Sequence, residues 1–174
     1  MKNNTVYTDG SSTGNGRMNA VGGIGVFFAP GDSKNVSKNL ETFYLKTFPN
    51  EKINKSTNNL AELCAILQAF LILQSNLDNN EIVTIVSDSM YSINSLSIWY
   101  LKWKKNGWMN AAKKPVSNKE VISTIVDNYI LKYPGNIKFR HVKAHTNGGS
   151  ADWFGNQQAD LLATNVENLN FSIK

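Results

Sequence analysis

The first third of the chain carries the hydrophobic pattern of β-strands. The segments TVYTDGSS (residues 5–12) and AVGGIGVFFA (residues 20–29) are rich in β-branched and aromatic residues. The Gly- and Asn-rich stretch between them predicts a turn, so a hairpin is the simplest connection. The segment SKNLETFYLKTF (residues 37–48) predicts a third strand, whose imperfect alternation is expected near a sheet edge.

The pattern changes to alternating helices and strands in the rest of the chain. Apolar residues recur at helical spacing from about Asn58 to Ser75, and the β-branched run EIVTIVS (residues 81–87) then predicts a buried strand. The later elements, in chain order, are helices over 89–106 and 118–133, a short strand over 136–145 and a last helix over 153–169. Three strands, a helix, a strand, several helices, a strand and a helix indicate an α/β fold, with a mixed sheet and helices on both faces.

Composition supports one intracellular domain. The chain has 174 residues, 41% of them hydrophobic, which is enough for a single core. The lone Cys64 lies among leucines at helical spacing, which predicts a buried apolar residue and gives no disulfide framework. The first strand begins too early for a signal or transit peptide, and the longest apolar run is too short to cross a bilayer. We expect a soluble protein of the cytoplasm or nucleus with no membrane partner.

Positive charge is concentrated in one part of the chain, whose formal net charge is +5. No acidic residue lies between Asp88 and Glu120. This interval holds Lys102, Lys104, Lys105, Lys113, Lys114 and Lys119, interleaved with Trp99, Trp103 and Trp108. Positive charge beside flat aromatic surfaces suits a nucleic-acid backbone with exposed sugars or bases. The alternative is a solvated helix face whose aromatic residues pack inward.

Four carboxylates have both an ordinary and a catalytic interpretation. Turn chemistry explains Asp9, a capping box with Asn59 explains Glu62, a helix cap explains Asp88, and solvent exposure explains Asp160. Yet Asp9 and Asp88 end strands that a sheet can place side by side, where α/β sheets form their sites. Carboxylates gathered there would repel one another unless a cation such as Mg²⁺ neutralised them. The chemistry implied is metal-assisted phosphodiester hydrolysis.

Five motifs carry a resemblance to a known family. YTDGSS, NLAELCAI, VSDSMYSIN, HVKAHT and GNQQADLLA, in this order and spacing, resemble type 1 ribonuclease H from about Val6 to Ala163. The basic segment LKWKKNGWMNAAKKPVSNKE resembles the substrate-binding region of that family, here called the handle (about residues 97–119). The resemblance implies the ribonuclease H-like fold, with a five-stranded sheet of three antiparallel and then two parallel strands. It also implies one catalytic domain over residues 1–174, without an accessory N-terminal hybrid-binding domain.

The resemblance further implies an activity and a set of site residues. The activity is hydrolysis of the RNA strand of RNA/DNA hybrids, giving 5′-phosphate and 3′-hydroxyl ends, by a monomer. The four carboxylates would hold two Mg²⁺ ions, with Mn²⁺ as an alternative. His145 would assist proton transfer or product release, unless it is an ordinary loop histidine. The expected substrate contacts are Asn15, Asn58 and Asn59 to the RNA 2′-hydroxyls, Lys55, Thr57 and Asn118 to a DNA phosphate, and Tyr91, Trp99 and Trp103 as aromatic surfaces. His141 and Trp108 are expected to be structural.

Two departures from the family pattern and several alternative functions stay open. Position 55 is commonly Arg in cellular relatives, and Lys lacks the bidentate fork. The loop between His145 and Asp160 is several residues longer than usual, and we expect its Asp152 to be a solvated acid instead of a further metal ligand. The alternatives are a hybrid-binding module that does not cut, another nuclease on the same scaffold, and an excised reverse-transcriptase domain. Retention of all four acids argues against the first of these.

Overall fold

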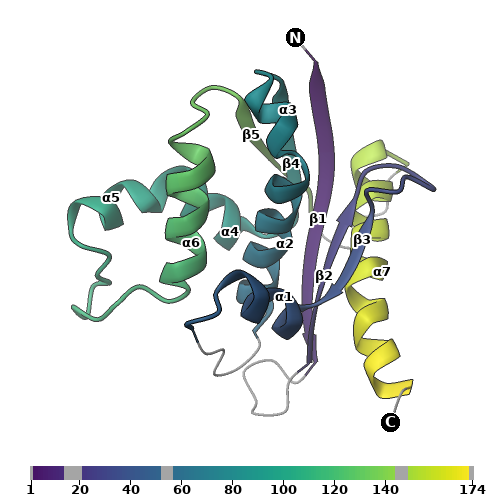
Figure 1. Cartoon of the computed structure of the whole chain (residues 1–174), viewed down its shortest axis with the longest axis horizontal. Helices are drawn as coiled ribbons and strands as arrows, with labels where there is room; N and C mark the ends of the chain where they lie inside the picture. The colour runs from purple at the N-terminus through teal and green to yellow at the C-terminus, as the bar shows by residue number, and fades with distance from the viewer. Residues whose placement is uncertain (1, 14–20, 52–56, 144–148, 173–174) are drawn as a thin grey trace.

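The core of the structure, a computed structural model, is one five-stranded sheet (Figure 1). Residues 2–13, 21–51, 57–143 and 149–172 are described. The strands are β1 (Asn3–Thr13), β2 (Val21–Phe27), β3 (Val36–Asn39), β4 (Ile82–Ser87) and β5 (Ile137–His141), arranged in the order β3-β2-β1-β4-β5. The first three pair antiparallel, and β4 and β5 continue the sheet in parallel from β1. The mixed sheet predicted from the order of elements is confirmed.

Helices cover both faces of this sheet. They are α1 (Leu40–Thr47), α2 (Asn58–Ile72), α3 (Gln74–Asp78), α4 (Met90–Asn94), α5 (Tyr100–Lys105), α6 (Lys119–Ile125) and α7 (Ala151–Ser172), with π-helical turns η1 (Ser95–Trp99) and η2 (Val126–Ile130). Figure 1 shows α7 on one side of the sheet, opposite α1 and α2. Successive side chains of β1 point to opposite faces of the sheet. Val6 packs in the larger core with α2, and Tyr7 packs in the smaller core with α7.

Helix α2 is the central helix of the larger core. Every residue from Leu60 to Phe70 is buried, so this part of the helix lies inside the protein, with Glu62 and Gln68 as its buried polar residues. Cys64 is among these residues and is fully buried, as predicted. No helix in the described part of the chain is long and apolar enough to cross a membrane.

The predicted third strand is wrong over most of its length. Only Val36–Asn39 pairs with β2, and the chain then turns into α1. The side chain of Asn39 caps this helix by accepting a hydrogen bond from the backbone N–H of Thr42 at 2.9 Å. The buried residues Leu40, Phe43 and Tyr44 follow helical spacing. The cap and this spacing together outweigh the imperfect two-residue alternation.

Close contact between the sheet and α7 gives a first testable prediction. A Cβ atom at Gly25 of β2 would lie 2.2 Å from the carbonyl oxygen of Ala159 and 2.8 Å from the backbone nitrogen of Ala163. Gly25→Ala should therefore push α7 away and lower the free energy of unfolding by about 2 to 3 kcal/mol, measured by urea denaturation. The matched control is Gly149→Ala, whose Cβ would meet no atom within 4 Å. Equal losses in both variants would contradict the prediction.

Candidate active site

Two neighbouring strands bring the first two carboxylates together, because Asp9 lies within β1 and Asp88 directly follows β4. β1 and β4 run parallel, and Tyr7 of β1 pairs with Val86 of β4. Asp9 and Asp88 each lie two residues further along, so they occupy neighbouring positions at the same edge of the sheet. This edge is where parallel strands place functional side chains.

Helix α2 supplies the third carboxylate, but not through the expected capping box. The cap is Thr57, whose hydroxyl accepts a hydrogen bond from the backbone N–H of Leu60 at 3.1 Å. Asn59 is therefore inside the helix, and the predicted Asn59 cap is wrong. The Glu62 side chain instead accepts a hydrogen bond from the backbone N–H of Gly10, the residue after Asp9. This bond fixes Glu62 against β1, beside Asp9.

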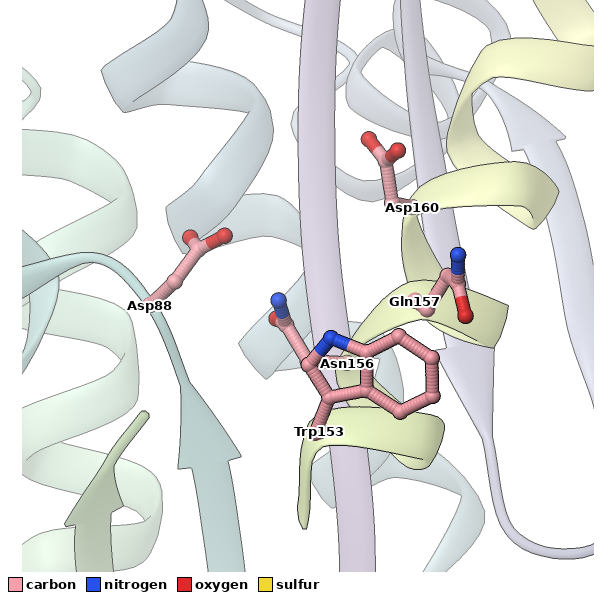
Figure 2. A pocket seen from close by; sticks show the side chains of 5 residues that line it. All are labelled: Asp88, Trp153, Asn156, Gln157 and Asp160. Carbon is pink, nitrogen blue, oxygen red and sulfur yellow. The ribbon is translucent and has the colours of Figure 1, made fainter. Parts of the chain in front are cut away.

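The four carboxylates surround one cleft. One oxygen from each of Asp9, Glu62 and Asp88 lies within 4.8 Å of the other two. The cleft, of about 310 Å³, is also lined by Asp160, Asn58 and Asn59, and by Gly10, Ser11 and Ser89. A smaller pocket of about 110 Å³ adjoins it, where Asp88 from the end of β4 and Asp160 from α7 face the space between them (Figure 2). The structure thus brings together all four predicted acids.

Burial and mutual repulsion raise the pKa values of the inner carboxylates. Burial raises the pKa of Asp9 to about 8, and Asp88 and Asp160 add to this rise, which a hydrogen bond with Glu62 only partly offsets. The pKa of Glu62 is also raised, first by burial and then by Asp9 and Asp88. The site therefore holds more negative charge than it can stabilise alone. A set of carboxylate oxygens in this state suits a hard divalent cation.

The predicted substrate-contacting residues and His145 fall into three groups by where they lie in the structure. Asn58 and Asn59 are exposed at the cleft, whereas the hydroxyl of Thr57 is engaged in the helix cap. Asn15, Lys55 and His145 lie outside the described residues, so their roles stay predictions.

The third group forms an aromatic row on the handle side. The rings of Tyr91, Trp99, Trp103 and Trp108 follow one another with centroid separations of 6.1, 6.0 and 6.1 Å. Asn118 joins the row by donating a hydrogen bond from its side-chain amide to the Tyr91 hydroxyl at 3.1 Å. Trp108 packs against the larger core, as predicted, and Trp103 does so too. Trp99 is the most exposed tryptophan of the row.

Several residues near the cleft were not singled out from the sequence. Trp153, Asn156 and Gln157 line the smaller pocket from α7 (Figure 2). Asn156 and Gln157 belong to the motif GNQQADLLA, and all three residues precede Asp160 by three to seven positions on a predicted helix. His141, expected to be structural, has its Nε2 atom 3.3 Å from the backbone oxygen of Asp88.

The comparisons with known proteins agree with this geometry. The RNase H family model matches residues 1–168. A ribonuclease H of Schizosaccharomyces pombe is 41% identical over 158 residues, covering 91% of this chain and 50% of that protein. A ribonuclease H of Clostridium botulinum is 35% identical over 147 residues, covering 84% of this chain and 86% of that protein.

A solved structure of the foamy viral protease-reverse transcriptase in complex with RNA/DNA hybrid has a similar fold. The TM-score is 0.67 at 23% identity, over 92% of this chain and 19% of that chain. This chain spans about half the length of the Schizosaccharomyces pombe relative. The family match, which extends over nearly the whole chain, agrees with the five sequence motifs and with the placement of the four acids. The chain belongs to the RNase H family.

Proposed function

We propose that this chain is an endoribonuclease that hydrolyses the RNA strand of RNA/DNA hybrids, leaving 5′-phosphate and 3′-hydroxyl ends. The observation that carries the proposal is the group of carboxylates around one cleft, in a chain of this family. We further propose that residues 1–174 act as one catalytic domain and as a monomer.

Two divalent ions, Mg²⁺ or alternatively Mn²⁺, would be held by Asp9, Glu62, Asp88 and Asp160. When bound, they would supply activation of the attacking water and stabilisation of the leaving oxygen. Asp9 interacts with each of the other three acids, so it is the central residue of the set that would hold the ions. We propose His145 as the group that moves a proton or eases product release.

Substrate selection would use polar groups beside the carboxylates and the handle. Asn58 and Asn59 reach the cleft from the first turn of α2, where an RNA 2′-hydroxyl next to the scissile phosphate would find hydrogen-bonding partners. The other proposed contacts are Asn15 on the RNA strand and Lys55, Thr57, Asn118, Tyr91, Trp99 and Trp103 on the DNA strand. The handle lysines would add sequence-independent attraction for phosphates.

The test compares end-labelled RNA/DNA hybrid, double-stranded RNA and double-stranded DNA, each with Mg²⁺ and with EDTA. Metal-dependent cutting of only the RNA of the hybrid supports the proposal. Binding of hybrid without cutting would favour the binding-module alternative. Cutting of double-stranded DNA would favour another nuclease on the same scaffold.

The aromatic row gives a prediction that separates binding from packing. Trp99 is 39% exposed, so Trp99→Ala should change the free energy of unfolding by less than about 1 kcal/mol but weaken hybrid binding about 10-fold, through lost stacking. Trp108→Ala should lower the free energy of unfolding by about 2 kcal/mol, because Trp108 packs on the core. Fluorescence anisotropy with labelled hybrid and urea denaturation measure the two effects. Unchanged hybrid affinity in the Trp99 variant would remove this residue from the proposed binding surface.

A further inference from the structure

Asp152 joins three elements of the fold through its two carboxylate oxygens. The Nε and Nη2 atoms of Arg140 donate hydrogen bonds to Oδ2 and Oδ1 at 2.7 and 2.9 Å. The hydroxyl of Tyr7 donates a third hydrogen bond to Oδ1 at 3.0 Å. Asp152 lies in the first turn of α7, which begins earlier than predicted because the Ser150 hydroxyl accepts a hydrogen bond from the backbone N–H of Trp153 at 3.1 Å. The expectation of a solvated loop acid is therefore wrong.

The two partners of Asp152, Tyr7 and Arg140, lie in the sheet near the carboxylates. Tyr7, Val86 and Arg140 are paired in register across β1, β4 and β5, so they form one row of the sheet. Asp152 bridges the two ends of this row, over Val86. Asp9 follows Tyr7 by two residues and Asp88 follows Val86 by two residues. The network is thus fixed to the same two strands that present two of the acids.

Helix α7 carries the fourth acid between two points of attachment. The first point is the Asp152 network. Close packing of α7 on the Tyr7 ring reinforces it at Gly155, where an added Cβ atom would lie only 2.4 Å from the ring. The second point lies just beyond Asp160, where the hydroxyl of Ser37 donates a hydrogen bond to the carbonyl oxygen of Leu162 at 2.5 Å. Asp160 is about two helical turns from the first point. The orientation of the helix between these points decides how far Asp160 lies from Asp9.

We propose that Asp152 is a positioning residue that sets the place of Asp160 over Asp9 and Asp88. The inference rests on the proposed function of the carboxylates. A charge-assisted bidentate pair fixes direction as well as distance, so the network orients the first turns of α7 relative to the two strands. Without it, the helix keeps its second attachment, its close packing on Gly25 and its apolar contacts, but nothing directs its first turns. Asp160 would then reach the proposed metal site less often in the productive geometry.

The test is Asp152→Ala, assayed at a temperature where circular dichroism shows the variant folded. We expect a kcat about 10-fold lower and a Mg²⁺ concentration for half-maximal activity about 10-fold higher, with KM for hybrid within about 2-fold of wild type. The rise in Tm on adding Mg²⁺ should also need about 10-fold more Mg²⁺. Tyr7→Phe, which removes one hydrogen bond and keeps the ring, should give a smaller change in the same direction. The double variant Arg140→Met with Asp152→Ala should be no worse than Asp152→Ala alone.

A purely structural ion pair would give another pattern. In that case Asp152→Ala would lower Tm but keep the wild-type kcat and Mg²⁺ dependence, which would overturn the proposal. Asp32→Asn is the matched control, because it removes a surface ion pair with Lys34 (3.0 Å) in another turn. It should change neither kcat nor the Mg²⁺ dependence. If the wild type cuts no substrate, the proposed function fails. The Mg²⁺-dependent Tm of the variants then still tests the positioning role, as does Tyr7→Phe if Asp152→Ala does not fold.

Discussion

Replacing Asp9 by Asn should lower kcat on RNA/DNA hybrid at least about 1,000-fold, corresponding to about 4 kcal/mol of lost transition-state stabilisation. The amide keeps the shape of the side chain but loses the negative charge. Asp9 is the acid that interacts with the other three, so its loss affects every position at which a cation would bind. Single-turnover cleavage of end-labelled hybrid at saturating Mg²⁺ measures the effect.

Binding and a surface control make this result specific. Hybrid affinity in EDTA should stay within a few-fold of wild type, since the handle and the aromatic row are unchanged in Asp9→Asn. Asp32→Asn, in the turn between β2 and β3, should cut at the wild-type rate. If Asp9→Asn cuts as fast as the wild type, Asp9 is only a strand residue and the catalytic assignment is wrong.

The sequence predicted that the four acids lie together better than it predicted the elements around them. Asp9 and Asp88 follow β-branched and aromatic runs that predict strands, and their neighbouring positions follow from the parallel pairing of β1 and β4. The segment after Asn39 was misassigned because eight residues are too few for the two periodicities to separate clearly. The helical signal there depended on a cap, Asn39, that is also common in turns.

Long-range polar contacts could not be predicted. Asp152 binds Arg140, 12 positions away, and Tyr7, 145 positions away, and no local pattern links the three. The same holds for the hydrogen bond between Gly10 and Glu62, which replaced a plausible local cap. A sequence pattern records which residues face the core, whereas the partners of a polar side chain depend on how the layers are stacked.

The raised pKa of Asp9 leads to a prediction about stability without metal. In the unfolded chain this carboxyl ionises near its ordinary pKa of 3.8, whereas in the folded protein it keeps its proton up to a pH of about 8. Between these values the unfolded state binds fewer protons. The free energy of unfolding of the wild type in EDTA should therefore fall as pH rises, by about 1.4 kcal/mol per pH unit for one retained proton. The contribution of Asp9 is complete below pH 4 and lost above pH 8.

Asp9→Asn removes this titration and serves as the comparison. Urea denaturation in EDTA at pH 5, 6 and 7 should show a shallower decline for Asp9→Asn than for the wild type, with the variant the more stable protein at pH 7. Asp32→Asn should follow the wild type. Saturating Mg²⁺ should raise wild-type stability more at pH 8 than at pH 5, because a bound cation favours the ionised carboxylates. Parallel pH profiles for the wild type and Asp9→Asn would show that the buried acid is not protonated in the folded protein, and the electrostatic basis for a metal site would then be lost.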